Sequence, residues 1–256
     1  MKKFINKILG KFGFKIYKVS TKRESSNNNN NSNNTDAYKV QKHLIKDYNS
    51  ELTIFDVGAY VGGIALKYNK LFPKSKIFCF EPFPDSFSTL EKNTVSFNNI
   101  ICINKGLSAQ EGTSKFQTNT SAPTNSIFKA HKSSEVVWGE GLLEALGTVE
   151  VEMTTLDNFV TAHAIEKIDI LKMDVQGAEF MVLNGAKKTL EKGIVDMIYT
   201  EIIMLPTYEG QIPFEETVKL IRSFGFELFN LYNYSLTNKG QLRQVDAIFI
   251  KSNSSS

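Results

Sequence analysis

The feature that most constrains the fold is a regular alternation between short apolar runs and segments of helical spacing, which begins after Tyr38 and continues to Lys251. The apolar runs have the length of strands and read LTIFDV, KIFCFE, NIICIN, IDILKMD, VDMIYTE and DAIFIK. The segments between them include IALKYNKLF, PDSFSTLEKNTVSF, AEFMVLNGAKKTLEKG and PFEETVKLIRSFG. Because nearly continuous apolar strands are typical of sheets buried on both faces, this order predicts an α/β domain whose mainly parallel sheet lies between two layers of helices.

The size and composition of the chain limit its class. With 256 residues, it is long enough for one large α/β domain or two small ones. Its formal net charge of +3 is too small to indicate nucleic acid as a partner. Cys79 and Cys102 lie inside apolar runs, so we expect buried free thiols in a reducing compartment. No apolar run is long enough to span a bilayer, and no secretory signal is evident, so we expect a cytoplasmic protein.

The two ends of the chain differ in character from its middle. Residues 1–22 place apolar side chains at helical spacing opposite several lysines, which predicts a basic amphipathic segment. Such a segment can make peripheral contact with the inner face of a membrane or pack on the domain, and both alternatives stay open. Residues 23–37 contain SSNNNNNSNN and predict a disordered linker, because they offer no apolar surface to offset the entropy of ordering. Residues 252–256 are expected to be a disordered tail.

The main domain is predicted to span residues 38–251. Within it, residues 118–148 interrupt the alternation of strands and helices, because this interval is polar and contains Pro123 and Trp138. We interpret it as an insertion near the active site.

A glycine-containing turn follows the first strand, in the sequence FDVGAYVGG. Asp56 ends the strand, Gly58 allows a tight turn and a close approach to a ligand, and Gly62 opens the next helix. The second strand ends in Glu81, where an acidic side chain can accept hydrogen bonds from both hydroxyls of a ribose. Helix capping would explain Glu81 alone, but the turn and the two acids together favour a nucleoside ligand.

The nucleoside ligand has two candidate identities, a nicotinamide dinucleotide and S-adenosylmethionine. The spacing D-x-G-x-x-x-G departs from the G-x-G-x-x-G pattern that accommodates a pyrophosphate. The methionine part of S-adenosylmethionine carries an ammonium and a sulfonium, which suit a carboxylate such as that of Asp56. The residues therefore favour the methyl donor.

Four segments together resemble the FkbM-type family of S-adenosylmethionine-dependent methyltransferases: FDVGAYVGG, FEPFPDSFSTLEKN, TLDNFV with IDILKMDVQGAEFMVLNGA, and VDAIFI. The resemblance implies a class I methyltransferase (Rossmann-like) fold, a three-layer sandwich with a seven-stranded, mostly parallel sheet and one antiparallel strand near its edge. FELFNLY and DAIFIK would form the closing hairpin. Tyr60 and Gln176 stand where the family commonly has asparagine and glutamate.

The fold that the resemblance implies also assigns the donor-binding residues. Leu107 and Ser108 stand where this fold usually meets the adenine ring, and Phe83 lies against the base or packs on the following helix. The full set of predicted donor contacts is Asp56, Gly58, Ala59, Tyr60, Gly62, Glu81, Pro82, Phe83, Leu107, Ser108 and Asp174.

Methyl transfer to oxygen needs positioning and a general base, and two strands supply candidates for the base. Asp174 ends IDILKMD and Glu201 ends VDMIYTE, so both should lie at the carboxyl edge of the sheet. Contact with the donor or capping of the next helix are alternatives for Asp174, and a salt bridge or a backbone hydrogen bond in the following loop are the alternatives for Glu201. The predicted acceptor contacts are Asn125, Ser126, His131, Gln176 and Glu179, with helix capping as the alternative for Glu179. We expect no metal requirement.

The function predicted from the sequence is O-methylation of a hydroxyl on a sugar, a glycolipid or polysaccharide unit, or a secondary metabolite. An NAD-dependent oxidoreductase and a non-catalytic module that only binds S-adenosylmethionine are the alternatives. The sequence leaves the acceptor and the oligomeric state open.

Overall fold

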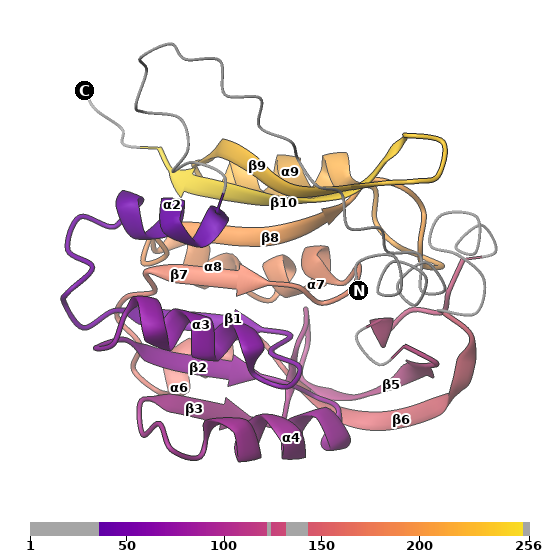
Figure 1. The fold of residues 1–256 in the computed structure, drawn as a ribbon, viewed down its shortest axis with the longest axis horizontal. Coiled ribbons are helices and arrows are strands. Elements are labelled where there is room, and N and C mark those ends of the chain that lie inside the picture. The colour runs from indigo at the N-terminus through magenta and orange to yellow at the C-terminus, as the bar shows by residue number, and fades with distance from the viewer. Residues whose placement is uncertain (1–35, 122–123, 132–142, 253–256) are drawn as a thin grey trace, which may run out of the picture. The chain divides into compact units, whose positions relative to one another are not determined.

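The computed structural model describes residues 36–121, 124–131 and 143–252 (Figure 1). The predicted amphipathic segment 1–22, almost all of the predicted linker, Trp138 and residues 253–256 of the predicted tail lie outside the described residues. The membrane contact of residues 1–22 therefore stays a prediction. Within the described ranges, every helix is too short or too polar to cross a membrane.

A seven-stranded sheet forms the centre of the domain, in the order β3-β2-β1-β7-β8-β10-β9. The first five strands of this order are parallel, whereas β10 runs antiparallel to both β8 and β9. This arrangement confirms the predicted sheet and its single antiparallel strand. The strands are β1 (Thr53–Val57), β2 (Lys76–Phe80), β3 (Ile100–Ile103), β7 (Ile170–Met173), β8 (Met197–Ile203), β9 (Phe226–Leu236) and β10 (Leu242–Lys251).

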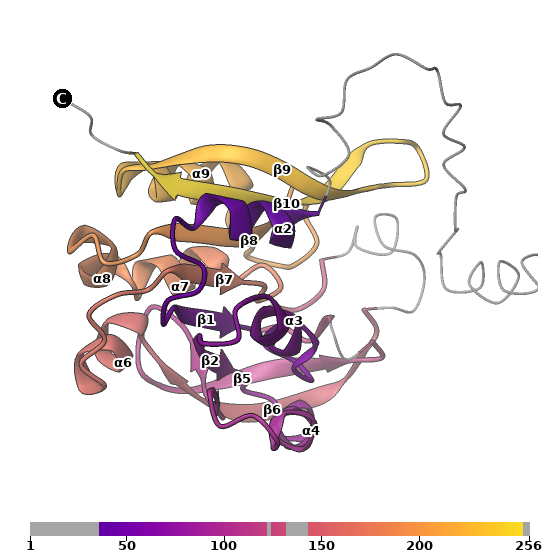
Figure 2. The same cartoon turned by 60° about the vertical axis from the view of Figure 1, so that its left-hand side comes forward.

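Helices cover both faces of this sheet, as Figures 1 and 2 show from two directions. Alternate residues of each strand point to opposite faces, so in β1 Ile54 packs with one layer and Phe55 with the other. The Ile54 face is covered by α2 (Ala37–Leu44), α3 (Gly63–Leu71) and α4 (Pro84–Thr94). The Phe55 face is covered by α6 (Leu156–Ala162), α7 (Glu179–Asn184), α8 (Lys187–Glu191) and α9 (Phe214–Ser223).

Two boundaries differ from those predicted. Helix α2 already begins at Ala37, because the side chain of Asp36 accepts a hydrogen bond from the Tyr38 amide (2.9 Å) and caps it, so the domain starts before residue 38. The segment 178–193 forms two short helices, α7 and α8, instead of one. They separate at Gly185, whose backbone packs so closely on the loop after β4 that a Cβ atom would lie 2.0 Å from the Ser108 carbonyl oxygen.

A second, three-stranded sheet borders the predicted insertion at residues 118–148 on both sides. Its order is β4-β6-β5, with β4 (Gly106–Leu107), β5 (Gly112–Asn119) and β6 (Ala145–Thr154). Strands β5 and β6 pair antiparallel from Gly112↔Met153 to Asn119↔Ala145. Phe116, Val151 and Met153 project from one face of this sheet and pack with Phe83, which follows β2. The interval thus begins and ends in strands and lies beside the carboxyl ends of the central strands.

Candidate functional site

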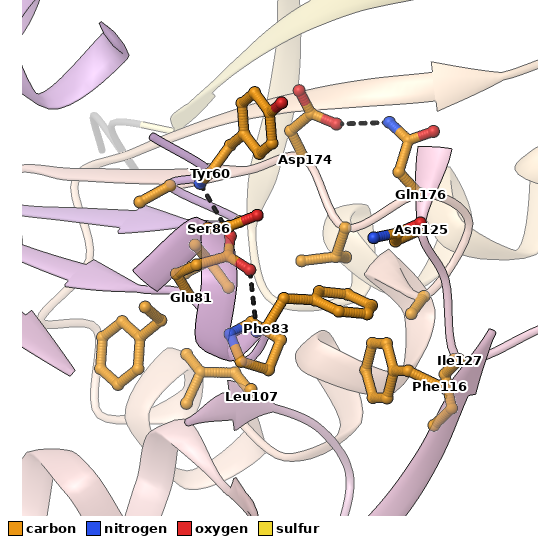
Figure 3. A pocket seen from close by; sticks show the side chains of 18 of the residues that line it. Tyr60, Glu81, Phe83, Ser86, Leu107, Phe116, Asn125, Ile127, Asp174 and Gln176 are labelled. Atoms are coloured by element: carbon orange, nitrogen blue, oxygen red, sulfur yellow. Dashed lines mark hydrogen bonds between the residues drawn. The ribbon is translucent and has the colours of Figure 1, made fainter. Parts of the chain in front are cut away.

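A cavity of about 290 Å³ lies beyond the carboxyl ends of β1, β2 and β7, where the strand order reverses. Its walls come from the loops after these three strands and from the second sheet. Figure 3 shows a polar part near Tyr60, Asp174 and Gln176 and an apolar part near Phe83 and Phe116. This is the position in which open α/β sheets bind ligands, as the sequence predicted.

Glu81 joins two of the loops that surround the cavity. One carboxylate oxygen accepts a hydrogen bond from the amide of Tyr60 (2.8 Å), and the other accepts one from the amide of Phe83 (3.0 Å; Figure 3). Burial raises the pKa of Glu81 to about 7, although these two hydrogen bonds lower it. Glu81 therefore holds the loop after β1 against the loop after β2, and its remaining lone pairs face the cavity.

Gly58 allows the loop after β1 to lie directly against the loop after β7. Its φ angle is +74°, and a Cβ atom there would lie 1.9 Å from the carbonyl oxygen of Asp174. Glycine is therefore required at this position for both backbone conformation and space. Gly58 and Ala59 also donate their amide protons to the carbonyl oxygen of Phe80 (3.0 Å each). The three loops consequently meet through their backbones.

The predicted contact between Asp56 and the donor is wrong. Asp56 is 0% exposed and does not line the cavity. Its side chain lies on the same face of β1 as Ile54, and its carboxylate is 2.8 Å from the ammonium nitrogen of Lys172. These residues are direct neighbours in the β1–β7 register. Burial acts to lower the pKa of Lys172, but the charges of Asp56 and Asp174 raise it overall, so the lysine is a cation. Lys172 also donates to the Gly58 carbonyl (3.0 Å), and the pair thereby supports the floor of the site.

Gly62 also lies off the cavity, contrary to the prediction. It precedes α3 in the left-handed conformation, with φ +87°, and a Cβ atom there would lie 2.8 Å from Leu90 of α4. Its role is therefore to let α3 and α4 pack. The other predicted donor contacts do line the cavity: Gly58, Ala59, Tyr60, Glu81, Pro82, Phe83, Leu107, Ser108 and Asp174.

Asp174 and Glu201 have different positions. Asp174 lines the cavity, and its Oδ1 accepts a hydrogen bond from the side-chain amide of Gln176 (2.8 Å). Glu201 lies behind Gln176 and does not line this cavity, which contradicts its predicted catalytic role. Its carboxylate accepts hydrogen bonds from Gln176 (3.3 Å) and Gln244 (2.6 Å). Burial, followed by the charges of Asp174, Glu179 and Asp246, raises the pKa of Glu201 well above its ordinary value.

Of the five predicted acceptor contacts, Asn125 and Gln176 line the cavity. Ser126 is completely buried and donates its hydroxyl to the Gln176 carbonyl (2.8 Å). Glu179 accepts a hydrogen bond from the Val175 amide (3.0 Å), which corresponds to the helix-capping alternative. His131 lies off the cavity, with its amide bound to the Thr207 carbonyl (2.8 Å). Complete burial therefore contradicts the predicted acceptor contact of Ser126, whereas Glu179 and His131 lie off this cavity and their acceptor contacts stay predictions.

The sequence reasoning missed the apolar wall of the cavity. Phe116, Ile127 and Met153 line it, and the ring of Phe116 packs edge-to-face against Phe83 with centroids 5.3 Å apart. The available signal was the alternation of larger apolar residues in β6, VEVEM, which is typical of a strand with one buried face. Lys172, a charged residue inside an otherwise apolar strand, indicates a structural role with a buried stem, and its ion pair with Asp56 agrees with that role. Among the described residues, no group of three or more His, Cys, Asp and Glu side chains is arranged to hold a metal ion.

The sheet order and the cavity at its switch point are those of the class I methyltransferase fold that the sequence resemblance implied. Residues 56–228 match the family described as the Methyltransferase FkbM domain, and the chain belongs to this family. Membership of a methyltransferase family excludes the oxidoreductase alternative.

Two curated proteins and one solved structure illustrate the relationship. The 2-O-methyltransferase NoeI of Sinorhizobium fredii (strain NBRC 101917 / NGR234) is 29% identical over 199 residues, which cover 74% of this chain and 79% of NoeI. The hexuronic acid methyltransferase AglP of Haloferax volcanii is 26% identical over 160 residues, 62% of this chain and 59% of AglP. A structure of Methyltransferase FkbM from Methylobacillus flagellatus KT is 11% identical with a TM-score of 0.49, and the match covers 81% of this chain and 45% of that one.

Proposed function

We propose that this methyltransferase takes its methyl group from S-adenosylmethionine and transfers it to a hydroxyl oxygen of a sugar-like acceptor. The observation that carries the proposal is that Glu81, after β2, and Asp174, after β7, line one cavity on either side of the loop after β1. We assign Glu81 to the ribose of the donor and Asp174 to the reacting hydroxyl of the acceptor.

The residues around the cavity fit the parts of the donor. The carboxylate of Glu81 suits the ribose hydroxyls, which donate hydrogen bonds. Leu107, Phe83 and Phe116 offer an apolar slot for the adenine ring. The loop after β1 and Asp174 form the polar end, where a carboxylate favours a cationic group.

Asp174 is the proposed general base. Its Oδ1 is occupied by the Gln176 amide, whereas its other oxygen points away from Gln176 (Figure 3). When bound, S-adenosylmethionine supplies an electrophilic methyl carbon on a sulfonium leaving group. The acceptor oxygen forms the new bond to that carbon as the bond to sulfur breaks, and Asp174 takes the hydroxyl proton. The cavity walls contribute to the rate by holding the acceptor in line.

A sugar-like acceptor is supported by the names of two relatives, a 2-O-methyltransferase and a hexuronic acid methyltransferase. Asn125 lies on the acceptor side of the cavity with its oxygen bound to the Asn119 amide (2.7 Å). Its amide nitrogen is thereby oriented as a donor, which suits a hydroxyl or ring oxygen of a sugar.

The first test is a thermal-shift titration with S-adenosylmethionine, S-adenosylhomocysteine and NAD. We expect the first two to stabilise the chain, by about 2.7 kcal/mol at a concentration of 100 Kd, and NAD to have no effect. Stabilisation by NAD alone would refute the donor assignment.

The second test measures methyl transfer from labelled S-adenosylmethionine to a panel of sugars and glycosides. We expect Asp174→Asn to lose transfer to a far greater extent than donor binding, and the exposed helix variant Glu91→Gln to behave as wild type. Full activity of Asp174→Asn would remove Asp174 as the base. Absence of transfer by the wild-type protein to any hydroxyl, with donor binding intact, would favour the non-catalytic alternative.

A further inference from the structure

We infer that Tyr208 is a positioning residue of the active site, because its hydroxyl fixes the side-chain amide of Gln176 with the nitrogen facing Asp174. This inference rests on the proposed role of Asp174 as the general base. Tyr208 does not line the cavity itself, so its effect on the reaction passes through Gln176.

The hydrogen bonds around Gln176 define one orientation of its amide. The nitrogen donates to Asp174 Oδ1 (2.8 Å) and to Glu201 Oε2 (3.3 Å). The amide oxygen accepts the hydroxyl proton of Tyr208 (2.8 Å). As the proposed base, the Asp174 carboxylate only accepts hydrogen bonds, so the amide nitrogen must face it and the amide oxygen must face a donor. Tyr208 is that donor, and its longer contact with the Thr124 carbonyl (3.3 Å) competes only weakly.

The backbone of Gln176 is held as firmly as its side chain. Its φ angle is +54°, a left-handed conformation that is unfavourable for a residue other than glycine. Ser126 donates to its carbonyl (2.8 Å), and the ring of Tyr208 lies against the next residue, where a Cβ atom on Gly177 would be 3.0 Å from Tyr208 Cδ2. The ring and the hydroxyl of Tyr208 therefore both contact the segment formed by Gln176 and Gly177.

Tyr208 is itself fixed in place. It is 2% exposed, and its backbone amide donates to the side-chain oxygen of Gln211 (3.3 Å). It also pairs with Ala130 through an isolated β-bridge. A side chain held this way offers its hydroxyl in one direction, which is what a positioning role needs.

The chemical consequence concerns the two carboxylates on either side of the amide. With the Gln176 nitrogen between them, Asp174 and Glu201 share a donor. With the amide turned round, its oxygen would face Asp174, whose charged form would lose a hydrogen-bond donor, and that loss favours uptake of a proton. A protonated Asp174 cannot act as the base. The other ionisable groups whose charges act at this site are Asp56, Lys172, Glu179, Asp246 and the phenol of Tyr208.

The test compares Tyr208→Phe with Tyr68→Phe. Both substitutions remove a buried hydroxyl that donates to a glutamine Oε1 at 2.8 Å, but Tyr68 bonds Gln41 within the core on the other face of the sheet. We expect Tyr208→Phe to lower kcat about tenfold and to move the acidic limb of the pH–rate profile upward by about one unit, while donor Kd is unchanged. Tyr68→Phe should lose only thermal stability. Equal kinetic and pH effects in the two variants would overturn the inference.

A second measurement needs no acceptor. In the wild-type protein, the side-chain amide of Gln176 should give a resolved pair of NMR signals that shift as the pH is lowered, and Tyr208→Phe should broaden or average them. Unchanged signals in Tyr208→Phe would overturn the inference even if the enzyme proved inactive. Conversely, the wild-type protein could show no methyl transfer while Tyr208→Phe still alters these signals. That result would refute the proposed function and still support the positioning of Gln176 by Tyr208.

Gln176→Asn provides a second variant if Tyr208→Phe does not fold. Asparagine tolerates the left-handed backbone, but it is one methylene too short to reach from Tyr208 to Asp174. We expect the same upward shift of the acidic limb. A wild-type pH profile in Gln176→Asn would overturn the inference.

Discussion

Donor affinity should depend on pH through Glu81. Its pKa is raised to about 7, mainly by burial, and the ionised carboxylate is the form that accepts hydrogen bonds from ribose hydroxyls. Between pH 8 and pH 6 the ionised fraction of a group with this pKa falls about tenfold, so Kd should rise about tenfold, or about 1.4 kcal/mol. Binding should also release a proton near neutral pH.

Ionisation of Glu81, which strengthens donor binding, lowers the stability of the free protein. The pKa of Glu81 in the folded chain lies above its ordinary value of 4.5, so the folded state holds an extra proton between about pH 4.5 and pH 7. Its contribution to the free energy of unfolding is therefore complete below pH 4.5 and is lost as the pH rises through 7. Glu179, with a pKa raised by burial to about 7, adds to stability with the same sign. Raising the pH should thus weaken the free fold while strengthening donor binding.

Calorimetric titration with S-adenosylhomocysteine at three pH values measures this effect. In Glu81→Gln we expect weak binding with a flat pH dependence. The amide can offer an oxygen to only one of the two backbone N–H groups of Tyr60 and Phe83, and the mismatch should cost about 1–3 kcal/mol of stability. Glu91→Gln, on the exposed face of α4, is the matched control. A tenfold pH dependence that survives in Glu81→Gln would refute the assignment of the titrating group.

Three further predictions concern the residues that hold the loops of the site and the start of the domain. Asp56→Asn should lower the free energy of unfolding by about 3–5 kcal/mol in denaturant titrations, because it leaves the Lys172 cation buried without its partner, and unchanged stability would contradict the ion pair. Gly58→Ala should cost about 2 kcal/mol or more and reduce donor binding, since the new methyl group would force the backbone of Asp174 away; wild-type calorimetry in this variant would contradict the close approach. A chain that starts at Asp36 should unfold at the same temperature as the full chain, and its collapse would refute the domain boundary.

The sequence predicted the parts of the site that lie at the ends of strands. An apolar run fixes where β2 ends, so the acid that follows it, Glu81, had to lie at the carboxyl edge of the sheet. Asp56 shows the limit of this reasoning, because it is one residue before the end of its strand and points to the α3 face. The period of two along a strand, together with Lys172 inside β7, was the evidence for a buried pair.

The pairing of strands in the second sheet could not be predicted from the sequence pattern. The exposed faces of β5 and β6 are polar, and their pairing joins residues far apart in sequence, such as Gly112 and Met153. Local pattern indicates a strand but not its partner. The orientation of the Gln176 side chain depends on contacts among the loop after β7, the loop after β8 and the segment that contains Ser126. No spacing in the sequence predicts that these three segments meet.

The loops of the proposed donor site are held together mainly by backbone groups. Glu81 binds two loop amides, Lys172 binds a loop carbonyl, and Gly58 provides space by lacking a side chain. Because these contacts involve backbone groups and buried side chains, the proposed donor side should leave little freedom for variation. The acceptor side is built from side chains on the β5–β6 sheet and its connection, such as Asn125 and Ile127. Substitutions there should therefore change which acceptor is methylated and leave donor affinity intact, and a loss of donor affinity in Asn125→Ala would show that this division is wrong.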